Sequence, residues 1–203
     1  MKKRNVMTMA LSLAMVGVIG VGGTLAYLSA TPDKKVNTFE FANGLEATLT
    51  EDASGNTNGD ATSTSSGIAY TGLVPGVNIA KNVEATFTSD IDAYFFIKID
   101  KTTDKNTDLK ITDLLLSAGW EKFDPVSGTT AAITDEDTYG EYVFEYDGTG
   151  EDVTTSADLF DTVYVDSSVT SGTLNDIIIS VKAVQKDGFE SMKAAYDAVD
   201  YKA

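Results

Sequence analysis

Alternation of apolar and polar residues with a period of two recurs along this chain and constrains its fold more than any other feature. The pattern is clearest in residues 36–50, 82–88 and 176–185. Such alternation predicts half-buried β-strands that turn one face toward a core. Residues 93–100 (AYFFIKID) are apolar on both faces at their start. This favours a central strand buried on both sides.

Three further strand patterns lie at residues 120–123, 139–146 and 159–166, whereas two segments have helical spacing. The helical segments are predicted at 107–119 and 189–201, where apolar residues recur every three or four positions. We count about eight strands without βαβ alternation. The chain is therefore predicted to be all-β, an antiparallel β-sandwich with two short peripheral helices.

Residues 51–67 (EDASGNTNGDATSTSSG) interrupt the strand patterns. The segment has no apolar periodicity and is dense in Gly, Ser, Thr, Asn and Asp, a composition typical of loops. We predict a mobile loop there. A break at residues 43–44 (Asn-Gly) within the first strand pattern indicates a bulge or a turn. Residues 36–203 are predicted to form one sandwich domain around this loop.

Residues 1–26 have the layout of a secretory signal peptide. Three basic residues near the start are the only charges among the first 32 residues, and an apolar run spans residues 6–21 before small residues follow. This layout predicts export, with cleavage after Ala26 and a new N-terminus at Tyr27. Cleavage after Ala30 is the second choice. A retained membrane anchor is the alternative, because a membrane helix needs about 20 mostly apolar residues.

The charge balance and two missing residue types exclude several functions. Removing residues 1–26 takes away three of the 15 basic residues and none of the 31 acidic ones, so the net charge goes from −16 to −19. Such a surface argues against nucleic acid as a partner. The chain has no Cys and no His. Disulfides, His-dependent catalytic triads and His-ligated zinc sites are therefore excluded.

Calcium is the metal most compatible with this composition, because it takes oxygen ligands. Asp104, Asn106 and Asp108 have the opening spacing of an EF-hand loop, but Leu109 and Leu115 stand where Gly and Glu belong. That match is spurious, and a second acidic run, DED before residue 138, is interpreted as a charged turn. We predict no catalytic residue, no metal ligand set and no cofactor, with Ca²⁺ as the one ion left open.

Four segments of the chain carry a family resemblance. They are GGTLAY at 22–27 with NTF at 37–39, LVPG at 73–76 with residues 83–87 and the bend at 89–90, LFDTV at 159–163, and residues 178–189, which include AVQKDGF at 183–189. Together they resemble the camelysin/TasA family of secreted Gram-positive proteins. The first resembles signals processed by a SipW-type signal peptidase. The resemblance implies a jelly-roll form of the sandwich and a place in the extracellular biofilm matrix or at the cell surface.

The resemblance also implies self-assembly into fibres, in which a freed N-terminal segment completes the sheet of the next subunit. Cleavage would release residues 27–35 as a flexible leader, and an extended segment can add to an exposed sheet edge. The partners would be other copies of the chain, the signal peptidase during export and, left open, an accessory matrix protein. The predicted assembly strand comprises Val36, Thr38, Phe39, Phe41 and Leu45.

Three alternatives stay open at this stage. Residues 36–50 would simply pair within their own domain in a monomer. A monomeric adhesion or carbohydrate-binding module at the cell surface would use the aromatic residues of segments such as YGEYVFEY as a platform. A camelysin-like secreted protease is disfavoured, because the chain lacks HExxH and every other His-based zinc motif.

Overall fold

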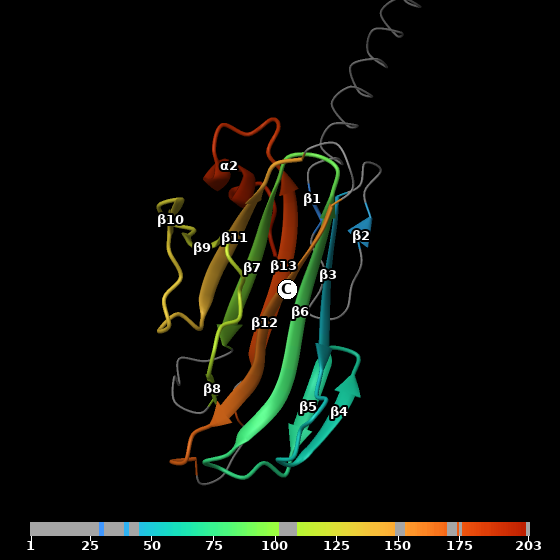
Figure 1. Ribbon diagram of the computed structural model, residues 1–203, viewed down its shortest axis with the longest axis vertical. Helices are drawn as coiled ribbons and strands as arrows, with labels where there is room; N and C mark the ends of the chain where they lie inside the picture. The colour runs from blue at the N-terminus through green and yellow to red at the C-terminus, as the bar shows by residue number, and fades with distance from the viewer. Residues whose placement is uncertain are drawn as a thin grey trace, which may run out of the picture.

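The computed structural model describes residues 29–30, 39–40, 45–101, 109–148, 153–169, 174 and 176–201. Over these residues the chain forms two antiparallel sheets and a separate hairpin (Figure 1). Sheet A has the strand order β1 (Ser29–Ala30), β13 (Ile177–Gln185), β7 (Ala93–Lys101), β11 (Gly140–Tyr146), β9 (Trp120–Asp124) and β10 (Thr129–Ala131). Sheet B has the order β2 (Phe39–Glu40), β3 (Glu46–Asp52), β6 (Asn78–Ser89), β12 (Val153–Val165) and β8 (Leu109–Ile111).

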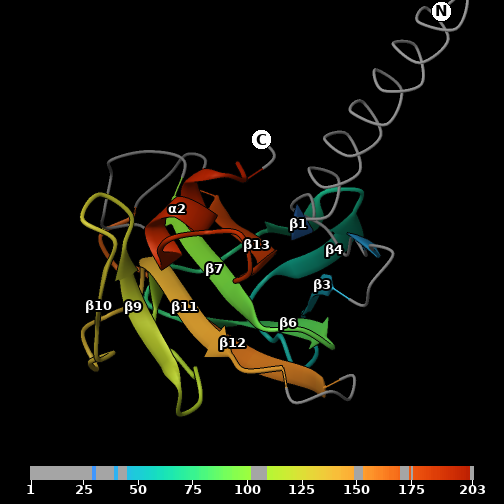
Figure 2. The ribbon, with the colours of Figure 1, turned by 90° about the horizontal axis from the view of Figure 1, so that it is seen from above.

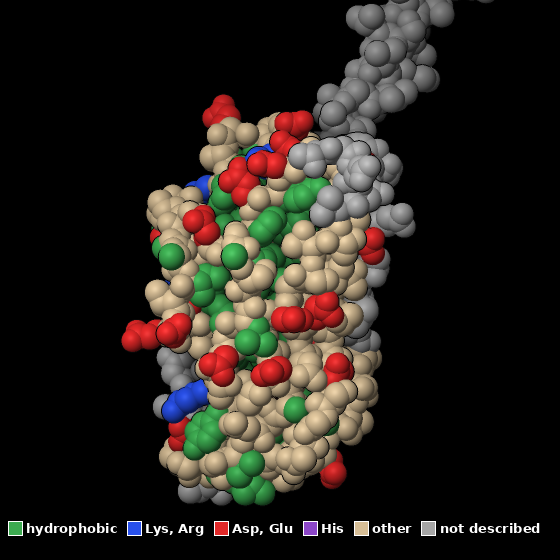
Figure 3. Space-filling model, viewed as in Figure 1, with side chains coloured by type: hydrophobic (Ala, Val, Ile, Leu, Met, Phe, Trp, Pro, Cys, Tyr) green, Lys and Arg blue, Asp and Glu red, His purple; other side chains and the backbone are tan. Residues whose placement is uncertain are grey.

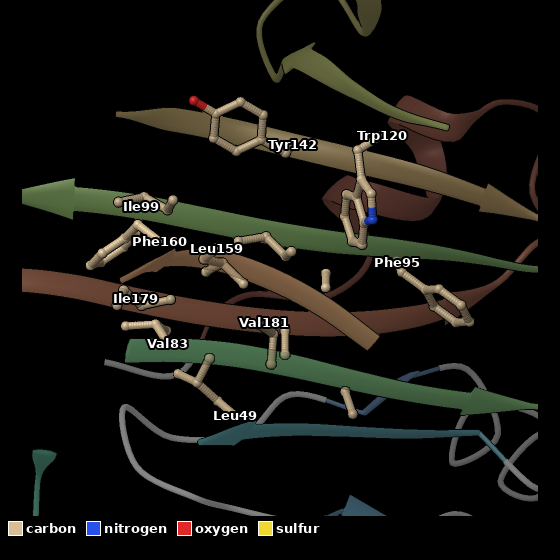
Figure 4. Packing of buried hydrophobic residues seen from close by; sticks show 14 of the residues in the cluster. Leu49, Val83, Phe95, Ile99, Trp120, Tyr142, Leu159, Phe160, Ile179 and Val181 are labelled. Carbon is tan, nitrogen blue, oxygen red and sulfur yellow. The ribbon is translucent and has the colours of Figure 1, made fainter. Parts of the chain in front are cut away.

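The two sheets bury their facing side chains in one core, as the period-two alternation predicts. Along β6, every second residue from Ile79 to Ser89 is buried, and the residues between them are partly exposed. Figure 4 shows Leu49 and Val83 from sheet B pointing toward the same interior as Ile179 and Val181 from sheet A. The β-sandwich expected from the sequence is therefore confirmed as architecture.

A third layer covers the outer face of sheet A. The helix α2 (Met192–Asp197) lies on the side of β7 and β13 that faces away from β6 and β12 (Figure 2). Beneath it a second apolar cluster buries Phe96, Phe123, Val143, Val184 and Ala195. The helix predicted at 189–201 is thus present over its central residues, and β7 is a central strand with apolar residues on both faces, as expected.

The helix predicted over 107–119 is wrong. Its described residues, 109–119, instead form β8 (Leu109–Ile111) and an irregular segment that runs beside β12. The Leu115 amide donates to the Leu159 carbonyl at 2.8 Å, so backbone bonds to a neighbouring strand replace helical ones. Leu115 is 42% exposed although its spacing placed it on the apolar face. Among the described residues, α2 is the only helix.

The irregular structure predicted for residues 51–67 is also wrong in part. Strand β4 (Asp60–Thr64) forms a hairpin with β5 (Gly67–Thr71) at the lower end of the molecule in Figure 1. Asn58 is 3% exposed and ties the start of this hairpin to the turn before β6, because its amide group bonds Val74 and Val77 backbone atoms. A polar composition conceals this strand because all five side chains of β4 are exposed.

Candidate functional site

The outer edge of β13 is the most distinctive feature of the fold for function. On one side, β13 pairs with β7 along its whole length, from Ile177 to Gln185. On the other side, β1 contributes only the pairs Ser29↔Val184 and Ala30↔Ala183. Within the described part of the chain, residues 177–182 have no strand partner on that side. We call Ile177–Gln185 the acceptor edge.

The acceptor edge lacks the protection that edge strands usually carry. Its sequence is IIISVKAVQ, and Lys182 is its one charged residue. Natural edge strands are commonly guarded by solvent-facing charges, by Pro or by bulges, because their free backbone groups are templates for another strand. Lys182 is 1% exposed and points away from solvent. No solvent-facing charge therefore guards this edge, and its residues from Ile179 to Val184 are buried in the single chain.

The Lys182 ammonium is held beneath the C-terminal segment. Its Nζ donates to the carbonyl oxygens of Tyr196 and Val199, each at 2.9 Å. The same atom lies 3.4 Å from the ring centroid of Tyr196 and 4.4 Å from that of Tyr201. Such contacts between a cation and a ring face are favourable, above all where water is excluded. The residues 189–201, called here the C-terminal clamp, are thus fastened to β13 from the outer face.

Burial changes the acid–base properties of this site. Removal from water lowers the pKa of Lys182 to about 8, against the opposing effect of the Glu141 carboxylate. The Tyr201 hydroxyl donates to Glu141 Oε2 at 3.5 Å, and burial together with that negative charge raises the pKa of Tyr201 well above its ordinary value. The cluster therefore combines an ammonium that loses its proton easily with a phenol that keeps its proton.

The structure places only part of the predicted assembly strand. Phe39 lies in β2 and pairs with Ala47 of β3 in its own sheet B. Leu45 is 2% exposed in the core of its own domain, so its side chain is not available to a neighbour in this conformation. Val36, Thr38 and Phe41 lie outside the described residues, as do Ala26 and Tyr27 at the predicted cleavage site. Within the predicted leader, Ser29 and Ala30 form β1.

The aromatic segments pack inside the protein. Phe95, Phe96 and Tyr142 are fully buried, and Trp120 is 5% exposed between the rings of Phe87 and Phe144. Trp120 Nε1 and the hydroxyl groups of Tyr142 and Tyr146 have no hydrogen-bond partner among the residues that the structure describes. These rings are core residues, so a carbohydrate platform built from them would have no exposed ring faces there.

The acidic residues do not assemble into a metal site within the described ranges. No group of three or more potential ligands is found there. Asp137, from the predicted charged turn, is instead buried and contacts Lys122, while Thr134 donates to its other oxygen. The false EF-hand residues Asp104, Asn106 and Asp108 fall outside the described residues. On the face shown in Figure 3, acidic side chains outnumber basic ones, as the net charge of −16 requires.

Sequence reasoning did not find Lys182. The available signal was indirect: the start of β7 is apolar on both faces, and the amphipathic segment at 189–201 offered a cover for one of them. The burial of Lys182 depends on where residues 189–201 dock on the sheet, and the sequence pattern does not specify that position.

Comparison of the chain with protein-family models, with curated proteins and with solved structures finds no match. No helix in the part of the chain that the structure describes is long and apolar enough to cross a membrane.

Proposed function

We propose that the chain is an exported structural protein, a subunit of extracellular biofilm-matrix or cell-surface fibres with a jelly-roll type of sandwich. Subunits join when the N-terminal strand of one copy adds to the sheet of the next. The observation that carries this proposal is the acceptor edge, which, among the residues that the structure describes, pairs with β1 only at its C-terminal end. The segment that supplies β1 directly follows the predicted cleavage site at Ala26.

The pairing direction supports an exchange of strands. β1 runs antiparallel to β13, so residues that follow Ala30 would extend along residues 177–182. A longer pairing adds backbone hydrogen bonds and places alternate side chains against the edge. If β1 leaves its own β13 and pairs with that of a neighbour, the contact is head-to-tail and generates an open filament unless it closes into a ring.

The test is electron microscopy of the chain recovered from the medium of an exporting host, over a series of concentrations and pH values. N-terminal sequencing of the same sample establishes the cleavage site. Lower pH neutralises part of the negative charge and weakens repulsion between subunits. We expect regular filaments. Monodisperse particles under every condition would contradict the fibre and favour the adhesion module.

A matched pair of variants tests the strand itself. Ser29→Pro with Ala30→Pro removes the backbone donors of β1 and should abolish filaments while the domain stays folded, because Pro cannot pair within a ladder. The control, Ser29→Val with Ala30→Val, keeps the donors and should preserve filaments. Filaments formed equally by the Pro variant would exclude β1 as the donated strand.

The assembly strand predicted from the sequence has its own test. Phe39→Asp with Phe41→Asp places charges on the segment at β2 and should abolish polymerisation without unfolding the monomer. Because Phe39 pairs with β3 of the same chain, unchanged fibres would restrict the donated segment to β1, and the pairing of β2 would then serve the single domain alone.

A further inference from the structure

Lys182 connects the two ends of the chain through one strand. Its neighbours Ala183 and Val184 pair with Ala30 and Ser29 of β1. Lys182 itself binds the carbonyl oxygens of Tyr196 and Val199 in the C-terminal clamp. Val184 is fully buried in the outer apolar cluster together with Ala195 of α2. The same short stretch of β13 is therefore held by the N-terminal strand at its edge and by the clamp on its outer face.

The ammonium serves the clamp in a way that an apolar side chain would not. The last carbonyl groups of a helix have no partners within the helix, and Tyr196 belongs to the last turn of α2. A cation at this position also interacts favourably with the negative end of the helix dipole. An apolar residue would fill the space but would leave these carbonyl groups without the bonds that Lys182 donates.

The geometry points to Lys182 as a positioning residue for assembly: by tying the C-terminal clamp to β13, it sets the conformation of the acceptor edge that receives the N-terminal strand. This inference rests on the proposed function, from which it takes the role of Ile177–Gln185 as the strand that receives the N-terminal segment. It assigns the clamp a role in assembly, and it makes the two ends of one chain energetically dependent on each other.

The contact of Lys182 with the C-terminal clamp, called here the tie, is expected to strengthen or weaken with pH in a direction that follows from the pKa of Lys182. When the clamp opens, Lys182 enters water and regains an ordinary pKa near 10.4, whereas in the closed clamp the pKa is about 8. The open state thus binds more protons between these values, so closure strengthens as the pH rises through this window. The other charged or titratable groups that face Lys182 are Glu141 on β11, Lys98 on β7, and Tyr196, Asp197, Asp200 and Tyr201 in the clamp.

Hydrogen exchange of the full exported chain at pH 7 and pH 9, corrected for intrinsic exchange rates, tests the tie directly. In the wild type, opening of residues 189–201 and of the acceptor edge should fall together by about tenfold from pH 7 to pH 9. Lys182→Met has no titrating group at this position and should lose this pH dependence. Lys182→Arg keeps the charge at both pH values and should lose it as well.

The control is Lys193→Met, which removes a lysine of α2 that bonds Asp197 and the Pro125 carbonyl. It keeps every other titrating group that faces Lys182, so it should retain the tenfold change. Equal pH dependence in the wild type and in both Lys182 variants would overturn the inference. The inference would also be overturned if hydrogen exchange in the C-terminal clamp depended on pH while exchange in the acceptor edge did not.

Assembly supplies the second measurement. Between pH 7 and pH 9, the critical concentration for filament formation should fall more in the wild type than in Lys182→Met. Filaments with the same pH dependence in both chains would show that the tie has no role in assembly. If no chain forms filaments while exchange follows the expected pattern, the fibre proposal fails and the tie between clamp and edge stands.

Discussion

The two outer faces of the sandwich differ in chemistry and in what covers them. On sheet A, Phe96 and Phe123 lie under the clamp and are almost fully buried. On sheet B, the corresponding positions carry hydroxyl groups, and Thr88 contacts Thr154 at 3.2 Å while Thr86 contacts Ser156 at 3.5 Å. These pairs are exposed. Figure 3 shows the side of β6 and β12, where carboxylates and several hydrophobic side chains lie among other side chains and backbone.

This contrast explains why only one of the two sheets carries a third layer. Both sheets turn an alternating apolar face toward the common core, so that face alone does not distinguish them. Sheet A is also apolar on its outer face, and water would contact several large rings there without the clamp. The clamp thus stabilises one face only, and its removal is expected to leave the sheet B face unaltered.

Truncation at matched outer positions should give the largest contrast. Phe96→Ala removes a ring that contacts Phe123 and Tyr196 and should lower the free energy of unfolding by about 3–5 kcal/mol. Thr86→Ala on the other face should change it by no more than about 0.5 kcal/mol. Urea unfolding of the two variants measures both values. Similar losses in both would show that the faces are not energetically distinct.

The second-largest effect is expected at alkaline pH, which should destabilise the face that the C-terminal clamp covers. Burial and the Glu141 charge raise the pKa of Tyr201 in the folded chain. The contribution of Tyr201 to the free energy of unfolding is therefore complete below pH 10, and it is lost as the pH rises above the pKa of an unfolded tyrosine. At pH 11.5 the wild type should therefore be less stable than at pH 9, and the part of this loss attributable to Tyr201 is limited to about 2 kcal/mol. Unfolding of wild type and Tyr201→Phe at pH 9 and 11.5 measures it. The same loss in both chains would exclude Tyr201 as its source.

Two serines give the smallest contrast. The Ser191 hydroxyl oxygen accepts the Ala194 amide at 3.2 Å and caps α2 at its N-terminus. Ser191→Ala should destabilise the clamp by about 1 kcal/mol, as measured by local hydrogen exchange. Ser156→Ala on the bare face should change stability by less than about 0.5 kcal/mol. A larger effect at Ser156 would mean that the hydroxyl pairs of sheet B matter more than exposed contacts usually do.

The strands were predictable where alternation was long and the residues were β-branched or aromatic. β6, β7 and β13 lie where the pattern placed them. The short strands β4 and β10 were missed because their side chains are all exposed and carry no apolar signal. The helix expected over 107–119 failed because Leu109 and Ile111 fit a two-residue period as well as a helical one, and the edge of β12 was available to pair with them.

The candidate site, too, was predictable from the sequence only in part. The signal-peptide pattern predicted a released N-terminal segment, and the family resemblance implied an assembly strand at Val36, Thr38, Phe39, Phe41 and Leu45, which stays a prediction. The structure pairs Phe39 with β3 and sets Ser29 and Ala30 against β13. Which strand β1 joins depends on pairings between residues far apart in the sequence, such as Ser29 and Val184, and a local pattern does not contain that information.

The all-β class, the positions of the long strands and the acidic character of the chain can be read from the sequence, because side-chain alternation and charge are local properties. Which outer face is covered, which strand β1 joins and where Lys182 lies follow from the tertiary structure. Those outcomes depend on where the 189–201 segment docks. Docking is governed by the shape and apolar area of a surface that exists only once both sheets have formed.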